Sequence, residues 1–443
     1  MTAYAPHIVT LYGVPIDFIL FACVLAGVAL FHAHTLRVAV VGLAVVTLYK
    51  VAITGFKFGP GLAGLASHLG HEWVTLANLF GLLLGFALLS RHFEESRVPA
   101  VLPNYLPDDW KGGFVLLILV FFISSFLDNI AAALIGGAVA HVVFRARVHV
   151  GYLAGIVAAS NAGGSGSVVG DTTTTMMWID GVAPSEVFHA YAAAGVALMI
   201  FGVFAARQQH AYQPIEKDAA EGIVIDWTRV GICAFILIAA VVANVVANLR
   251  FPQVLDHFPV IGAAVWVAIL LSVPLRQPEW PLLKDALRGS IFLLSLVTIA
   301  SMMPVEHLPV ASWQTALGLG FVSAVFDNIP LTALALRQGG YDWGFLAYAV
   351  GFGGSMIWFG SSAGVALASM YPQARSVGAW LRAGWHVALA YVVGFFVMLA
   401  LVGWHPGEKR VKSNAKPAAA TAPVAPPVDG APGATDDLMK KGY

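Results

Sequence analysis

Residues 160–181 read SNAGGSGSVVGDTTTTMMWIDG. This stretch decides how the chain is interpreted, because it places glycines, hydroxyl residues and the carboxylate of Asp171 in an otherwise apolar sequence. Of 443 residues, 59% are hydrophobic and only 11% are charged, against roughly 25% charged in an ordinary soluble domain. The apolar residues come in blocks of about 18–22, the length that crosses ~30 Å of hydrocarbon. The composition predicts an all-α polytopic membrane protein.

The apolar blocks and the charge distribution suggest an orientation in the membrane. Plain apolar blocks lie at 14–31, 35–52, 73–90, 187–206, 228–248, 258–275, 291–305 and 383–403. With the N-terminus outside, most Lys and Arg residues fall on cytoplasmic loops, as expected of a multi-pass protein of a bacterial inner membrane. Lys50 and Lys57 flank the end of the second span, where we expect their side chains to snorkel towards water.

Two motifs recur in the same order along the chain. SSFLDNIAAAL at 124–134 resembles SAVFDNIPLTAL at 323–334, and GGSGSVVGDTT at 163–173 resembles GGSMIWFGSSA at 353–363. Repetition in the same order predicts two copies of one structural unit. The predicted domains are a first transmembrane repeat (1–207), a cytoplasmic linker (208–227), a second repeat (228–404) and a disordered Ala/Pro-rich tail (405–443).

Each repeat is predicted to contain three plain spans, the Asp-Asn element, the glycine-rich element and a closing span. Basic residues flank the first Asp-Asn element on both sides, at Lys111 and at Arg145 and Arg147. Both flanks therefore favour the cytoplasmic side, which predicts a re-entrant hairpin from about 113 to 143. The glycine-rich element at about 148–182 is then a broken crossing helix. About five crossings per copy is an odd number, so the second copy is predicted to be inverted.

The polar residues of these elements predict an ion site. Broken helices at membrane depth survive only where protein or a cavity surrounds them, and their freed carbonyls and helix N-termini can bind ions. Side-chain oxygens suit a hard cation such as Na⁺ or Li⁺. A buried carboxylate can also take a proton when the cation leaves, so competition for one carboxylate suffices for antiport.

The candidate cation- and proton-binding residues are Asp128, Asn129, Asn161, Asp171, Thr172, Thr173, Asp327, Asn328, Ser361 and Ser362. The expected backbone breaks are the glycine and serine runs at 161–170 and 351–362, at Gly163, Gly164, Gly170, Gly353, Gly354 and Gly360. Simpler interpretations stand beside these. Asp128 and Asp327 can be helix caps, and some of the threonines from Thr172 to Thr175 can serve helix packing.

One further polar cluster, SHLGHEW at 67–73, contains His68, His71 and Glu72. Its order differs from the usual helical zinc-protease patterns. Its surrounding glycines predict a loop with a histidine pair, although an intramembrane metalloenzyme is the alternative. The chain has no Walker, dinucleotide-binding or nucleophile-elbow motif. We therefore expect a protein that is not an enzyme and has no cofactor, and the zero net charge gives no indication of nucleic-acid binding.

Four stretches of the chain resemble the NhaD-type sodium/proton antiporters of the ion transporter superfamily. They are LDNIAAALIGG, SNAGGSGSVVGDTTTTMMWI, SAVFDNIPL and the stretch from GFGGSMIWFGSSAGVA onward. The resemblance implies two inverted repeats, re-entrant hairpins that meet broken helices, scaffold spans that often form a homodimer, and elevator-like motion. It carries the ion-site role to the polar positions above. One departure is that Ala131, Ala132 and Ala133 stand where the family has hydroxyl residues after the first Asp-Asn.

Other functions stay open at this point. The superfamily also holds citrate and dicarboxylate carriers and the arsenite carrier ArsB. The motif cores contain no Lys or Arg, and three aspartates would repel an anion unless cations bind with it. No cysteine lies in the motifs to favour arsenite. A purely structural membrane protein would not need polar breaks repeated in both halves, so exchange of Na⁺ or Li⁺ for H⁺ is the leading hypothesis.

Overall fold

The computed structural model describes residues 8–31, 34–216, 223–251 and 253–407. The predicted tail lies outside the described residues from residue 408 onward. Within the described ranges the regular structure is helical apart from a short hairpin of β1 (Thr10–Leu11) and β2 (Val14–Pro15).

The helices follow the two halves of the sequence. The first half contains α1 (Ile16–Leu30), α2 (Thr35–Tyr49, continued by a π-helical turn at Lys50–Thr54), α3 (Gly61–Glu95), α4 (Val98–Val101), α5 (Trp110–Ser124), α6 (Asn129–Val143), α7 (Val150–Ser165), α8 (Thr172–Ile179), α9 (Pro184–Phe188) and α10 (Ala190–Tyr212). The second half contains α11 (Trp227–Arg250), α12 (Val260–Ser272), α13 (Leu283–Ser301), α14 (Trp313–Ser323), α15 (Asn328–Gln338), α16 (Trp343–Gly353), α17 (Ser362–Met370), α18 (Val377–Ala383) and α19 (Trp385–Val402).

Long apolar helices confirm the prediction of an all-α polytopic membrane protein. In the part of the chain that the structure describes, five helical segments are long and apolar enough to cross a membrane: Thr35–Thr54, Gly61–Val101, Pro184–Tyr212, Trp227–Ala247 and Trp385–Val402. They coincide with five of the predicted blocks. The blocks at 14–31 and 258–275 form the shorter apolar helices α1 and α12, and the block at 291–305 overlaps the C-terminal part of α13.

Two local expectations are wrong. His68, His71 and Glu72 lie within α3 rather than in a loop, because the helix tolerates the neighbouring glycines and starts at Gly61. Lys50 does not snorkel. It is 4% exposed, and its Nζ donates a hydrogen bond to Asp17 Oδ1 on α1 over 3.1 Å. A buried carboxylate on the neighbouring helix thus replaces water as the partner of the ammonium group.

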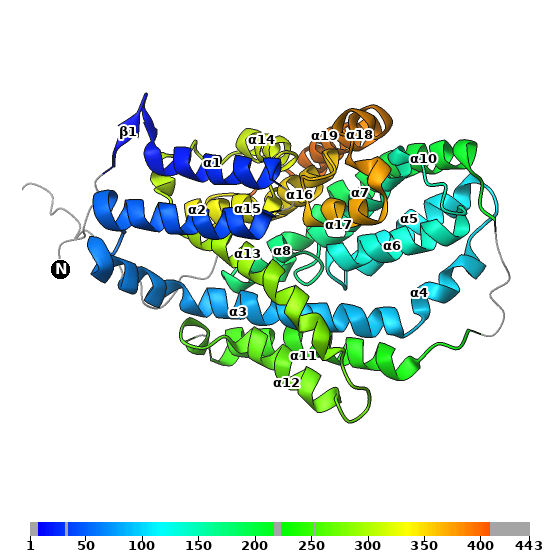
Figure 1. Ribbon diagram of the computed structural model, residues 1–443, viewed down its shortest axis with the longest axis horizontal. Coiled ribbons are helices and arrows are strands. Elements are labelled where there is room, and N and C mark those ends of the chain that lie inside the picture. The colour runs from blue at the N-terminus through cyan, green and yellow to red at the C-terminus, as the bar shows by residue number, and fades with distance from the viewer. Residues whose placement is uncertain (1–7, 32–33, 217–222, 252, 408–443) are drawn as a thin grey trace, which may run out of the picture. The chain divides into compact units, whose positions relative to one another are not determined.

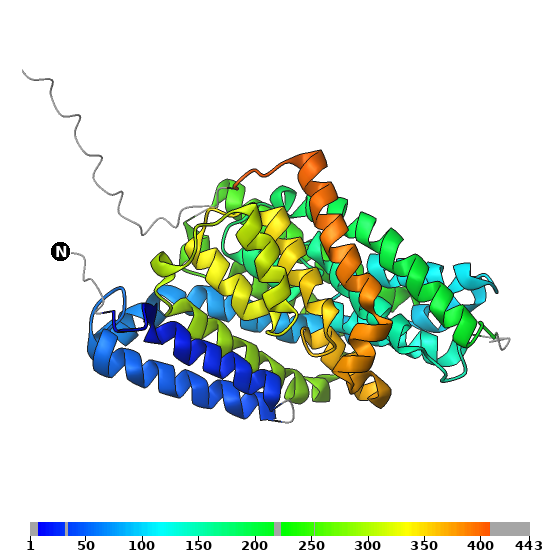
Figure 2. The same cartoon turned by 90° about the horizontal axis from the view of Figure 1, so that it is seen from above.

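Six helices form what we call the framework, α1–α3 and α11–α13. Helix α2 packs on α1 and α13, and α3 packs on α11, α12 and α13 (Figure 1). The framework therefore combines the first three long helices of each half. A second group, here called the central helices, consists of α5–α8, α10, α14–α17 and α19. Among these, α10 of the first half runs alongside α19 of the second (Figure 2).

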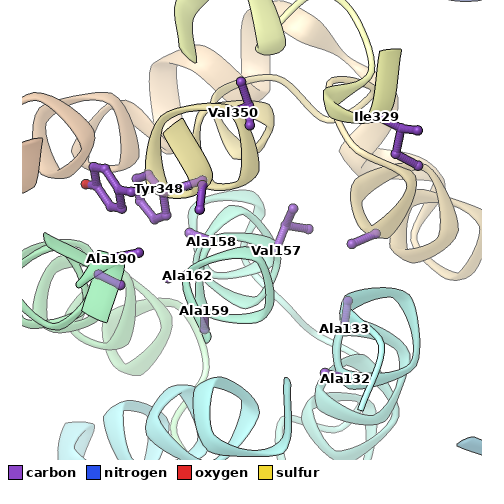
Figure 3. Packing of buried hydrophobic residues seen from close by; sticks show 14 of the residues in the cluster. Ala132, Ala133, Val157, Ala158, Ala159, Ala162, Ala190, Ile329, Tyr348 and Val350 are labelled. Carbon is purple, nitrogen blue, oxygen red and sulfur yellow. The ribbon is translucent and has the colours of Figure 1, made fainter. Parts of the chain in front are cut away.

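Helix α7 lies at the middle of the central helices, and its residues from Gly151 to Ser165 are all buried. Its small side chains face α10 and α16 in Figure 3, where Ala158 and Ala162 lie near Tyr348 and Ala190. Small residues allow close backbone approach in a membrane, where packing rather than hydrophobicity holds helices together. Helix α16 is also wholly buried, so the N-terminal parts of both glycine-rich elements form the core beside the candidate site.

Candidate functional site

Four helices begin at the polar motifs, each immediately after a capping side chain. The helices are α6, α8, α15 and α17, and their caps are Asp128, Asp171, Asp327 and Ser361. Each cap accepts a hydrogen bond from a backbone N–H two or three residues further on. Asp128 and Asp327 are therefore helix caps, as the simpler interpretation proposed. A carboxylate has about four lone-pair positions, so capping leaves acceptor capacity for an ion.

A chain of side-chain hydrogen bonds joins the two halves. Asn129 Nδ2 donates to Asn161 Oδ1 over 3.0 Å. Asn161 Nδ2 in turn donates to Ser355 Oγ over 2.9 Å and to Ser361 Oγ over 3.0 Å. Asn161 is completely buried, and these bonds use both of its amide hydrogens. We call the helix pair α5–α6 the first hairpin and the pair α14–α15 the second hairpin. Asn161 thus links the first hairpin to the second glycine-rich element. Ser355 is not among the predicted ligands, although it follows directly after the repeated Gly-Gly pair.

A second set of contacts surrounds the carboxylates. Asn328 Nδ2 approaches Asp171 Oδ2 at 3.5 Å, and Ser362 Oγ donates to Asp327 Oδ2 over 3.2 Å. A Cβ atom added at Gly351 would lie 3.3 Å from Asp171 Oδ2. The absence of a side chain at position 351 therefore leaves room for the Asp171 carboxylate from the other half. Gly351 is not among the predicted site residues, and it is the counterpart of Asn161 when Gly170 is aligned with Gly360.

The helix breaks are shorter than the glycine and serine runs predict. Helix α7 continues through Asn161, Gly163 and Gly164 to Ser165, and the break occupies residues 166–171, including Gly170. In the second half, α16 ends at Gly353, a 3₁₀ turn covers Gly354–Met356, and residues 357–361 with Gly360 form the break. Thr174 and Thr175 brace the first break, since their hydroxyls donate to the carbonyl oxygens of Ser167 and Val168.

The glycines within the helices allow neighbouring helices to pack closely and do not interrupt the helices that contain them. A Cβ atom on Gly163 would collide with the carbonyl oxygen of Phe121 on α5, and one on Gly353 would collide with that of Gly320 on α14. These contacts are equivalent in the two halves. They bring each Asp-Asn hairpin against its own broken helix, so the capping residues of both elements lie in one site.

Two cavities reach this site. The larger, about 550 Å³, is lined by the candidate residues Asp128, Asn129, Asp171, Thr172, Asn328 and Ser362. The smaller, about 230 Å³, reaches Asp327 and Ser362 instead. Asn161, Thr173 and Ser361 line neither cavity and are buried behind them. The structure thus places every predicted ligand near the helix starts, but only some of them at accessible surface.

Charged residues from the end of α3 and from the loop before α13 also line the larger cavity. They are Arg91, Glu94 and Glu279. Arg91 lies 2.9 Å from Glu94 and 3.5 Å from Glu95 and also pairs with Glu279. Arg229 continues the network from Glu95 to Asp226, and a hydrogen bond from Arg276 holds the pKa of Asp226 below its ordinary value. The basic groups of this network are all paired with carboxylates.

The charge at the helix starts favours a single positive guest. Each helix N-terminus is equivalent to about +0.5 of an elementary charge, so four contribute roughly +2. If all three carboxylates are ionised they contribute −3, which leaves about −1. Among described residues, the only Lys or Arg side chain that lines the larger cavity is Arg91. A single positive charge would balance this sum.

The His68 cluster does not form a metal centre in the structure. His68 bonds to Ser301 of α13 at 2.9 Å, His71 stacks on Phe58 with ring centroids 4.1 Å apart, and Glu72 pairs with Arg337 at the end of α15 over 2.5 Å. The described residues contain no group of three or more His, Cys, Asp or Glu residues able to hold a metal ion. Glu72 instead connects the framework to the second hairpin.

The fold and the site together define a multi-pass, all-α membrane protein with a buried polar site. The chain is 26% identical over 345 residues to "Sodium/proton antiporter 1" of Arabidopsis thaliana, which covers 67% of this chain and 55% of the relative. It is 23% identical over 347 residues to "Sodium/proton antiporter 2" of the same plant, which covers 67% of this chain and 76% of that relative. The chain thus spans just over half of the first relative. No family model matches the chain.

Proposed function

We propose that this protein is a secondary transporter that exchanges Na⁺ or Li⁺ for H⁺ across a membrane. The observation that carries the proposal is that four capped helix N-termini and three carboxylates meet at the two cavities. Among the described residues, neither cavity is lined by an unpaired Lys or Arg. Similarity to two proteins named sodium/proton antiporters supports it. Those proteins carry the antiporter name, and exchange by this chain is our inference.

The proposed mechanism is competition for the same carboxylates. Na⁺ is held by oxygens from Asp128, Asp171 and their neighbouring amide and hydroxyl groups, since a hard cation prefers oxygen ligands. When the cation leaves, a proton compensates the remaining negative charge, which is costly to leave uncompensated inside a membrane. Exchange then follows if the loaded site is exposed alternately to the two sides.

The finer architecture is part of the proposal. We infer that the two repeats are inverted, that α5–α6 and α14–α15 are re-entrant hairpins, and that the central helices move against the framework during alternating access. Matching element order in the two halves supports this arrangement. An inner-membrane location and a homodimer formed by framework helices complete the proposal.

A carboxylate carrier is the alternative that one observation favours, because helix N-termini can also bind anions.

Reconstitution separates the two functions. Purified protein in liposomes with a preset pH gradient and an acid-sensing dye receives Na⁺, Li⁺, K⁺ or citrate in turn. We expect Na⁺ or Li⁺ to collapse the gradient in the wild type and not in Asp128→Asn. Citrate uptake with no response to cations alone would overturn the proposal.

A further inference from the structure

The smaller cavity has a composition that the exchange of Na⁺ does not require. Its polar side chains are Asp327, Ser362 and Thr35, and the rest of its lining is apolar. Three phenylalanines stand in its wall, Phe292 of α13, Phe326 of the second hairpin and Phe359 of the second break. A hard cation prefers to be surrounded by oxygens, and these walls offer few. The cavity is therefore poorly suited to a bare Na⁺ ion.

The carboxylate at the end of this cavity is held in a fixed orientation. Asp327 Oδ1 accepts a hydrogen bond from the N–H of Ile329 over 3.0 Å, and Oδ2 accepts one from Ser362 over 3.2 Å. With about four lone-pair positions on the group, these bonds leave acceptor capacity. An organic ammonium group carries three hydrogen-bond donors, which Asp327 and Ser362 can accept. The apolar body attached to it is stabilised by burial against the apolar walls. Aromatic rings also attract cations.

The cavity lies where an apolar molecule can enter it. Its lining comes from α1, α2, α6, α13, the second hairpin, the second break and α17. Val325 and Val365 belong to that lining and are each 40% exposed. These two exposed valines give the cavity an apolar edge, at which an apolar molecule can make contact. At about 230 Å³ it is smaller than the ~300–1,000 Å³ of pockets for drug-sized ligands.

We propose that this cavity binds a small monovalent organic cation, a primary ammonium group attached to an apolar or aromatic body, with the ammonium group on Asp327 and Ser362. Ser362 and Ile130 line both cavities. An occupant of the smaller cavity therefore touches the wall of the larger one. If the protein exchanges Na⁺ as proposed above, the organic cation competes with Na⁺. This second consequence rests on the proposed function, whereas the binding itself does not.

Binding is tested on the full chain purified in detergent, with 2-phenylethylammonium as the probe and the neutral 2-phenylethanol as its isostere. We expect the ammonium compound to raise the Tm saturably and the alcohol at equal concentration to leave it unchanged, because only the cation engages Asp327. Equal stabilisation by both compounds would overturn the proposal. The absence of any shift with the ammonium compound would overturn it as well.

Two variants locate the binding site. Val28→Trp fills the smaller cavity from α1 and should remove the ammonium-dependent Tm shift, while Val45→Trp on α2, at a 46% exposed position outside both cavities, should keep it. If Val28→Trp does not fold, Val28→Phe gives the same comparison with a smaller ring. A full shift in the folded Val28 variant would show that the probe binds elsewhere and would overturn the assignment.

Competition is read separately in liposomes. At four times its dissociation constant the ammonium compound should raise the apparent KM for Na⁺ roughly fivefold, as mass action at one site requires, with kcat unchanged. A Tm shift that Val28→Trp removes, in a protein that exchanges no cation, would support the cavity while refuting the exchange function. Exchange of Na⁺ without any Tm shift would support the exchange function and refute binding of the ammonium compound in the cavity.

Discussion

The two halves of the site provide matched backbones and unmatched side chains. In the first half, α7 carries Asn161 and α8 is capped by Asp171, whereas the aligned positions in the second half are Gly351 and Ser361. Each larger residue of the first half extends into the second, Asn161 towards Ser361 and Asp171 towards Gly351. The first half thus supplies the longer side chains, and the second supplies space and hydroxyl groups. A nearly symmetric frame can therefore hold a one-sided charge.

The largest expected effect follows from that one-sided charge. Asp171→Asn keeps the shape of the cap but removes one of three carboxylates, so the roughly −1 charge of the site is lost. We expect Na⁺-driven proton flux in liposomes to fall at least about 100-fold, equal to about 2.7 kcal/mol. Ser361→Ala, at the aligned position, should lower the flux by less than about tenfold. The comparison fails if the two variants lose equal activity.

Asp180→Asn is the matched control, because Asp180 is the C-cap of the same short helix α8 and lies away from the site. Its flux should stay within about twofold of the wild type. A loss as large as that of Asp171→Asn would mean that any change of charge on α8 disrupts the protein, and that position 171 has no special role.

The space at position 351 gives the second test. Gly351→Ala places a Cβ atom 3.3 Å from Asp171 Oδ2, tighter than an ordinary carbon–oxygen contact, so the carboxylate must shift. We expect the Na⁺ concentration for half-maximal flux to rise about tenfold, or about 1.4 kcal/mol. Gly318→Ala on α14 has nothing within 4 Å of the added carbon and should leave this concentration unchanged. An unchanged value in both variants would refute the packing of Asp171 against Gly351.

Much of this arrangement is visible in the sequence, and part of it is not. The recurrence of Asp-Asn and of the glycine-rich stretch indicates two similar halves and places Asp128 and Asp327 at helix starts, because a short polar residue before an apolar run caps a helix. The roles of Gly163 and Gly353 could not be derived, since a glycine at a close helix contact and one in a break look alike in sequence. The contact of Asn161 with Ser361, 200 residues away, could not be derived from the sequence either, nor could the pairing of Glu72 with Arg337.

The open ends of the two hairpins differ in what holds them. In the first, Arg145 pairs with Glu216 of the adjoining linker, whereas in the second, Arg337 pairs with Glu72 of the framework helix α3. Glu72→Gln should lower the Tm in detergent by an amount equal to about 1 kcal/mol, because the pair is only partly buried. The charge exchange Glu72→Arg with Arg337→Glu should recover part of that loss. If the double variant loses as much stability as Glu72→Arg and Arg337→Glu lose together, the two side chains do not interact.

The smallest effect tests the symmetry of the frame itself. Ser124 Oγ donates to the carbonyl oxygen of Ser160 over 2.5 Å, and Ser323 Oγ donates to that of Val350 over 2.7 Å. These bonds join α5 to α7 and α14 to α16 at aligned positions, so Ser124→Ala and Ser323→Ala should each cost about 0.5–1 kcal/mol. Equal falls in Tm, with Na⁺ affinity retained, are expected if both halves use one frame. A clearly larger fall in one variant would mean that its bond also supports the charged side of the site, and that the asymmetry extends from the side chains into the backbone.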